Sequence, residues 1–257
     1  MNTAILLILL QQFVAGLIDS LTLKYSIFVT WKSERMRKVL SHIMVPNIIC
    51  MTVYLIISRY WILNMILYVP LVTIQILVNY YMLIKANSVV AKLFDESHRK
   101  EIDLIEKISD TISDLLFCNI TLVSSTILYY IFRNIGIFKL ICEILYGIIY
   151  SLIIGYTSSL NLLVESGLPF EQRLYFAENN LIYLIGYGMP LTVGYYTLPL
   201  IIYFAIQSLL VPLMIINSKK HFKPMGMPLS LPIISLLNKF NHWLFTGGIF
   251  LVKKLKK

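Results

Sequence analysis

Long apolar stretches alternate with short polar ones along most of this chain. Four of the apolar stretches cover about residues 40–58, 62–84, 117–130 and 140–164. An α-helix needs about 20 predominantly apolar residues to cross the hydrocarbon core of a bilayer. The pattern therefore predicts an all-α polytopic membrane protein with about four firm spans.

A fifth apolar stretch, residues 181–216, carries no charge and is much longer than one ordinary crossing requires. It contains residue types that weaken a helix interior. They are Gly186, Gly188, Pro190, Gly194, Pro199 and Pro212. We expect them to break the stretch into a re-entrant-like helical hairpin, and the alternative is one overlong, tilted helix.

Three further segments have patterns that suit helices outside the hydrocarbon core. Residues 1–31 contain an apolar run with polar interruptions, which favours an interfacial or re-entrant helix. In residues 86–116, apolar residues recur at helical spacing and acids share another face, which predicts an amphipathic cytosolic segment. The acids are Asp103, Glu106, Asp110 and Asp114. With an amphipathic basic tail at 228–257, the whole chain, residues 1–257, forms a single membrane domain.

The composition agrees with this interpretation. Hydrophobic residues make up 58% of the chain and charged residues 14%, with a mean hydropathy of +0.77. Soluble domains are nearer 45–50% apolar and about 25% charged. A chain this apolar cannot hide its side chains in one aqueous core.

The net charge of +9 is unevenly distributed, because Lys and Arg crowd residues 32–38, 219–223 and 253–257. If residues 181–216 enter the membrane and return to the same side, these basic regions all face that side. Positive charge marks the cytosolic side of membrane proteins. We therefore expect a lipid bilayer containing anionic lipids as the partner, with the basic loops and C-terminus cytosolic, and no nucleic acid.

A short polar helix is expected immediately before the fifth stretch. Ser166 to Pro169 resembles a helix-start signal, and the polar residues continue to Asn180. Arg173 and Glu178 are five residues apart, so they do not pair directly and each needs a partner elsewhere. We expect the helix to brace the broken stretch, whereas the rival interpretation is a solute site of the kind that broken helices form in transporters.

Candidate catalytic chemistry is sparse. His98 and Asp103 match the His-x4-Asp pattern of lipid acyltransferases, in which the His takes a proton from the acyl acceptor, but a solvated helix face explains them as well. Glu143 and Arg133 lie near span ends, where they either line an ion path or extend to the interface. The four histidines have no metal-ligand spacing. We therefore predict no enzymatic activity, catalytic residue, metal or cofactor.

The region around residues 170–218 carries a more specific signal. Gln172-Arg173-Leu174 is followed by Glu178 and Asn180, then by Tyr183 and by Gly186-Tyr187-Gly188-Met189-Pro190-Leu191, and later by Val211-Pro212-Leu213 with Ser218. This succession resembles the etoposide-induced protein 2.4 family of multi-pass membrane proteins. Gly16 and Asp19-Ser20 are similar to the N-terminal helix of that family. Two departures are Leu181-Ile182, where the family has Trp-Pro, and Glu178-Asn179, where it has Glu-Arg.

The resemblance implies a multi-pass, non-enzymatic endoplasmic reticulum protein acting in autophagy, cell-death control and membrane homeostasis. It implies other membrane proteins of the autophagy machinery as partners. The superfamily is also similar to bacterial sulfate permeases, and the alternative function is therefore an anion transporter or channel. A monomer and a homo-oligomer both fit the pattern. The candidate motif residues are Gln172, Arg173, Leu174, Glu178, Asn180, Gly186, Gly188, Pro190 and Pro212.

Overall fold

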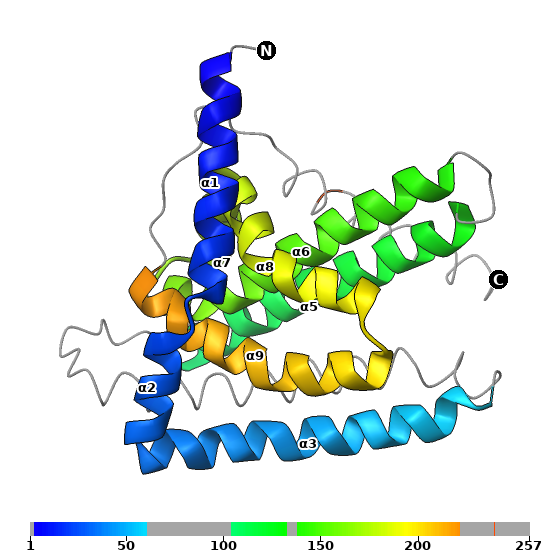
Figure 1. Cartoon of the computed structure of the whole chain (residues 1–257). Coiled ribbons are helices and arrows are strands. Elements are labelled where there is room, and N and C mark those ends of the chain that lie inside the picture. The colour runs from blue at the N-terminus through cyan, green and yellow to red at the C-terminus, as the bar shows by residue number, and fades with distance from the viewer. Residues whose placement is uncertain (1–2, 61–103, 133–137, 222–238, 240–257) are drawn as a thin grey trace, which may run out of the picture.

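The computed structural model describes residues 3–60, 104–132, 138–221 and 239 (Figure 1). All regular structure in these residues is helical and none is strand, so the all-α prediction is confirmed for them. The helices are α1 (Thr3–Leu21), α2 (Lys24–Lys32), α3 (Glu34–Ser58), α5 (Leu104–Phe132), α6 (Phe138–Glu165), α7 (Phe170–Asn179), α8 (Leu181–Thr197) and α9 (Leu200–His221).

Several predicted features lie outside the described residues. They are the span 62–84, the first part of the amphipathic segment at 86–103 with His98 and Asp103, the turn at Arg133, and the basic tail 228–257 apart from Lys239.

Helix α8 lies between α1 and α6 and contacts both through glycines. A Cβ atom on Gly16 of α1 would collide with the carbonyl oxygen of Tyr183, and one on Gly186 would collide with that of Phe13. Small residues let helices approach backbone to backbone in this way. These contacts fix α1 across the first half of α8.

The α6–α8 crossing is built in the same way. A Cβ atom on Gly155 would meet the carbonyl oxygen of Leu184, and one on Gly188 would meet that of Ser151. The Ser151 hydroxyl also donates a hydrogen bond to the Thr192 hydroxyl, at 2.7 Å. Helix α8 is therefore held closely on two sides.

The expected break at Gly186–Pro190 is not observed, because α8 is continuous from Leu181 to Thr197 with Pro190 inside it. Gly194 and Pro212 also lie within helices. The break falls instead at Leu198 and Pro199, where Leu198 is extended (φ −100°, ψ 150°) as is usual for a residue before proline. The chain reverses there, and α8 and α9 form a helical hairpin (Figure 1).

The turn between α6 and α7 differs in detail from the expectation. Gly167 has a positive φ of 71°, the Gly167 N–H donates to Val164, and the Leu168 N–H donates to Leu163. This is the pattern of a Schellman motif, which ends a helix. Ser166 therefore belongs to the end of α6, where its hydroxyl donates to the Leu163 carbonyl, and Pro169 directly precedes α7.

Helix α5 runs without interruption from Leu104 to Phe132, so it joins the end of the predicted amphipathic segment to the third predicted span. The Asp114 side chain is 0% exposed. Its expected place on a solvated acidic face is therefore wrong. The reason is that Asp114 forms an ion pair with the buried Arg173 side chain of α7 in the folded chain.

Two stretches among the described residues are long and apolar enough to cross a membrane, by length and composition. Lys139–Leu160 overlaps most of the predicted span 140–164. Ala4–Lys32 covers α1 and α2, which the sequence pattern assigned to the interface. Shorter apolar helices are Leu116–Tyr129 and Leu209–Ser218.

Candidate functional site: buried polar clusters around α7 and α8

Arg173 projects from α7 into the interior and pairs with Asp114 of α5. Its Nη2 lies 2.8 Å from the Asp114 Oδ2, and the two side chains are 1% and 0% exposed. The sequence required a partner for Arg173, and the tertiary structure supplies this carboxylate. A charge pair with this little exposure is isolated from the solvent.

Two further groups complete the surroundings of the pair. The Arg173 Nη1 donates to the Leu168 carbonyl at 2.6 Å, which ties the guanidinium to the turn before α7. The Tyr156 hydroxyl of α6 donates to the Asp114 Oδ1, also at 2.6 Å. We call Asp114, Tyr156, Leu168 and Arg173 the α7 cluster, and it connects α5, α6, α7 and the α6–α7 turn.

Aromatic rings from α5 and α7 pack beside the α7 cluster. The Phe117 ring meets the Tyr156 ring edge-on at a centroid distance of 6.0 Å and the Phe170 ring at 6.4 Å. Such apolar cover lowers the local dielectric and strengthens the charge pair. Removing one member of a buried pair leaves the other charge uncompensated, at a cost of about 3–5 kcal/mol.

The junction of α7 and α8 is also buried. Asn180 is 2% exposed, ends α7 and directly precedes α8. Its Nδ2 donates to the Phe176 carbonyl at 2.9 Å, and its own carbonyl accepts from the Leu184 N–H. Glu178 is 6% exposed. Asn180 is thus the single residue between the end of α7 and the start of α8.

A second polar cluster lies where α1, α8 and α9 meet. The Tyr183 hydroxyl donates to the Asp19 Oδ2 at 2.7 Å, and the Asn217 Nδ2 donates to the Asp19 carbonyl. The Tyr187 hydroxyl donates to the Met214 carbonyl. These bonds join the end of α1 to both arms of the α8–α9 hairpin.

The candidate motif residues divide between several environments. Arg173, Leu174, Glu178 and Asn180 are buried along the inner side of α7 and its junction with α8. Gln172 is exposed and is not part of either cluster. Gly186 and Gly188 form helix crossings, whereas Pro190 is half-buried in α8 and Pro212 is buried in α9.

Sequence reasoning missed the roles of Asp114 and Tyr156. Asp114 ended an acidic run and so looked solvated, but it directly precedes the apolar Leu115-Leu116-Phe117. This change from acidic to apolar residues was the sequence feature that could have indicated burial of Asp114. Tyr156 sits in an apolar stretch rich in tyrosine, and nothing in the pattern distinguished it.

The hydrogen bonds and the ion pair of the two clusters connect helices of the same chain. Among the described residues, no group of three His, Cys, Asp or Glu side chains could hold a metal ion. The Arg173 cation is neutralised by a carboxylate of the same chain.

Comparisons with known proteins add no relative: no family model, curated protein or solved structure matches this chain. The family resemblance therefore rests on the motif residues quoted above.

Proposed function

We propose that this chain is a non-enzymatic, multi-pass protein of the endoplasmic reticulum membrane. Buried polar side chains of the α7 cluster bond to other groups of the same chain, and we propose that the protein serves as a scaffold for other membrane proteins. The autophagy and membrane-homeostasis role, with autophagy proteins as partners, is supported by the motif resemblance at residues 170–218 alone.

The observation that carries the membrane proposal is the inverted polarity of α1. Its buried side includes Gln12, Gly16 and Ser20, which recur every four residues. Its exposed residues are mostly aliphatic and include Leu6, Leu7, Leu10, Val14, Ile18 and Leu21. A helix in water shows the reverse arrangement, because burying apolar area stabilises the fold by about 25 cal/mol per Å². A hydrocarbon environment removes that penalty.

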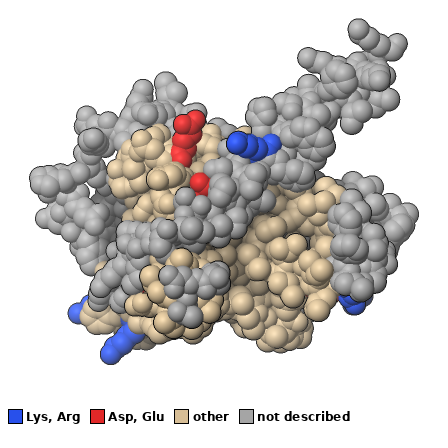
Figure 2. Space-filling view, turned by 90° about the horizontal axis from the view of Figure 1, so that it is seen from above, with Lys and Arg blue, Asp and Glu red and all other residues tan. Residues whose placement is uncertain are grey.

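Other described surfaces agree with lipid contact. Seen from above, most of the described surface is uncharged, and Lys, Arg, Asp and Glu form only small patches (Figure 2). Exposed aliphatic residues on the first turns of α6 include Leu140, Ile141, Ile144 and Leu145. Contiguous apolar surface of this kind marks membrane or protein contact.

A group of tyrosines connects the ends of neighbouring helices. Tyr146, Tyr150, Tyr195 and Tyr203 form a chain of ring contacts with centroid distances of 5.3–6.4 Å. Tyr129 joins it at 5.4 Å from Tyr146. Tyr129, Tyr195 and Tyr203 lie near the end of α5, the end of α8 and the start of α9, and the rings of Tyr146 and Tyr203 are buried. The ring contacts therefore hold these helix ends together, and we assign them to one side of the bilayer.

The opposite interface is assigned to α1 and α2. They run across the direction of α3 and α9 (Figure 1), and α1 crosses α8 near its start, at Gly186. A helix at the interface buries its apolar side at the boundary of headgroups and acyl chains, and the exposed aliphatic side of α1 suits that position.

The alternative, an anion transporter or channel, has less support. Anion sites in proteins use cations or helix N-terminal N–H groups, and the buried cation of the motif, Arg173, is paired with Asp114. The polar side chains around α8 bond to one another rather than lining a path. The scaffold function is therefore preferred.

The proposal is tested by localisation and by flux. We expect the tagged full-length protein in eukaryotic cells to colocalise with a reticulum marker and to remain in the pellet after alkaline carbonate extraction. Release into the supernatant would refute membrane integration, and a steady location elsewhere would refute the reticulum assignment. Purified protein in liposomes should conduct no sulfate above empty vesicles. Saturable sulfate flux, lost in Arg173→Ala while the protein stays folded, would establish the transport alternative.

A further inference from the structure

Helix α2 has inverted polarity like α1, but it carries large aromatic residues. Ser26 is 0% and Thr30 9% exposed, whereas Phe28 is 55% and Trp31 76% exposed. The buried residues face α3 and α9, where Val29, Met36 and Ile216 form a small apolar cluster. The aromatic side of α2 is therefore turned outward by packing on its other side.

One cation lies over an exposed aromatic ring, and a second is bonded to the backbone of the other aromatic residue. The Lys32 Nζ lies 4.5 Å from the centroid of the Phe28 ring. The Arg37 Nη1 donates to the Trp31 carbonyl at 2.7 Å, which uses one of the five N–H donors of the guanidinium. Cations and aromatic rings therefore occur at the same corner of the molecule, between α2 and α3.

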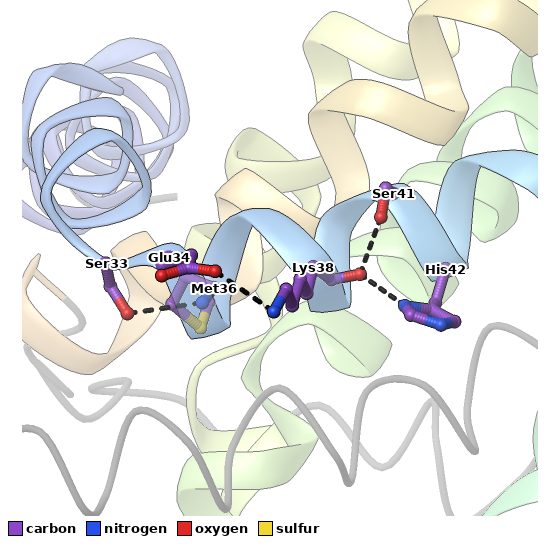
Figure 3. A network of polar contacts seen from close by, with 6 residues as sticks. All are labelled: Ser33, Glu34, Met36, Lys38, Ser41 and His42. Atoms are coloured by element: carbon purple, nitrogen blue, oxygen red, sulfur yellow. Dashed lines mark hydrogen bonds and ion pairs between the residues drawn. The ribbon is translucent and has the colours of Figure 1, made fainter.

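The first turns of α3 are well fixed (Figure 3). The Met36 N–H donates to the Ser33 hydroxyl at 3.2 Å, an N-cap bond, and Lys38 pairs with Glu34 at 3.0 Å. The Ser41 hydroxyl donates to the Lys38 carbonyl, and the His42 Nδ1 lies 2.5 Å from the same oxygen. Arg37 thus projects from a helix whose start is rigidly capped.

The electrostatic field at this corner is positive. From Lys24 to His42 the sequence has five Lys and Arg residues and one acid, Glu34, which already pairs with Lys38.

We propose that this corner binds the phosphate of an anionic phospholipid. We call it the Trp31 corner: Phe28, Trp31, Lys32, Arg37 and Lys38. The aromatic side chains lie in the interfacial layer, and Lys32 and Arg37 contact the headgroup phosphate. The proposal rests on the proposed membrane location.

The combination of cations with exposed aromatic side chains favours a lipid over an acidic protein as the ligand. A headgroup places phosphate directly beside apolar chains, which matches cations directly beside exposed aromatic side chains. Anionic lipid attracts basic residues near the surface by about fivefold in affinity for each Lys or Arg. A soluble acidic partner would leave Phe28 and Trp31 in water.

The test uses Trp31 as a fluorescent probe. The chain has three tryptophans, and Trp61→Phe with Trp243→Phe leaves Trp31 alone. This variant is reconstituted in vesicles that contain either brominated phosphatidylglycerol or brominated phosphatidylcholine at equal mole fraction. Bromine on the acyl chains quenches tryptophan at contact. We expect several-fold stronger quenching by the anionic lipid, reduced at high salt.

Matched variants locate the effect. Arg37→Gln and Lys32→Gln should each remove most of the preference for the anionic lipid, whereas Arg59→Gln, which removes an exposed charge after the other end of α3, should leave it unchanged. A preference unchanged in the first two variants would overturn the proposal.

The remaining outcomes separate the lipid site from the membrane location. Equal quenching by the two lipids overturns the headgroup site and leaves the membrane protein standing. Absence of quenching by either lipid, in protein that resists carbonate extraction, overturns the Trp31 corner alone. Loss of the preference on adding inorganic phosphate at constant ionic strength assigns the corner to free phosphate and overturns the lipid source.

Discussion

Two arginines of this chain illustrate how burial determines what a charge does. Arg173 of the α7 cluster is 1% exposed and pairs with the Asp114 carboxylate of α5, which also accepts a hydrogen bond from Tyr156. Arg37 of the Trp31 corner is exposed and has one donor on a backbone carbonyl of a neighbouring helix. In the interior a charge must be compensated by the chain itself, whereas at the surface it remains available to an external anion.

The largest expected effect is at the α7 cluster. Arg173→Ala should lower the free energy of unfolding by about 3–5 kcal/mol, because it leaves Asp114 charged and buried. Arg37→Ala should change it by less than about 0.5 kcal/mol. Denaturant titration in detergent, followed by circular dichroism, measures both. Similar losses of unfolding free energy in Arg173→Ala and Arg37→Ala would contradict the difference between the buried α7 cluster and the exposed Trp31 corner.

The double variant Arg173→Met with Asp114→Leu sharpens this test. It removes both charges and keeps the volume, so it should be more stable than Arg173→Ala. A double variant less stable than Arg173→Ala would show that the ion pair stabilises the fold by more than its own desolvation costs.

The next effect concerns the packing beside the α7 cluster. Gly188→Ala should cost about 1–3 kcal/mol, because its Cβ would collide with the Ser151 backbone oxygen and a helix must shift. Gly194→Ala is the matched control in the same helix, since its nearest neighbours are side-chain atoms at 3.6 Å or more. It should be neutral or stabilising. Thermal unfolding in detergent compares the two, and equal melting temperatures would argue against a close α6–α8 crossing.

A smaller effect is expected when one hydrogen bond to the buried carboxylate is removed. Tyr156→Phe should cost about 1.5 kcal/mol, because Asp114 keeps Arg173 and loses a hydroxyl donor. Tyr175→Phe, in the exposed side of α7, should have no measurable effect. If both substitutions are neutral in denaturant titration, Tyr156 does not stabilise the cluster.

The smallest effect is expected at the surface. Glu34→Gln breaks the ion pair between Glu34 and Lys38, in which the Lys38 side chain is 70% and the Glu34 side chain 71% exposed. The substitution should lower the free energy of unfolding by at most about 0.5 kcal/mol. High salt should abolish even this difference. A loss above about 1 kcal/mol would mean that the Trp31 corner shares the energetics of the interior.

The helical class followed from the apolar and polar pattern, and the location of the polar helix before Leu181 followed from Pro169 and the polar run. The pattern also identified Arg173 as a residue in need of a partner. It assigned Gly186 and Gly188 to a helix break, because glycine is a weak helix former in isolation. In the fold these glycines serve as contact points for α1 and α6, a role that depends on what lies opposite them.

The sequence by itself determined that the described chain is helical, that 58% of the whole chain is hydrophobic, and that positive charge gathers in separate short segments. Those properties are sums over local residues, so they survive any arrangement of the helices. Only the tertiary structure decided that Arg173 meets Asp114, that the chain reverses at Pro199, and that Trp31 faces outward beside Arg37. Each of these depends on which helix faces are brought together by packing, and backbone proximity between distant segments is not encoded in the periodicity of either one.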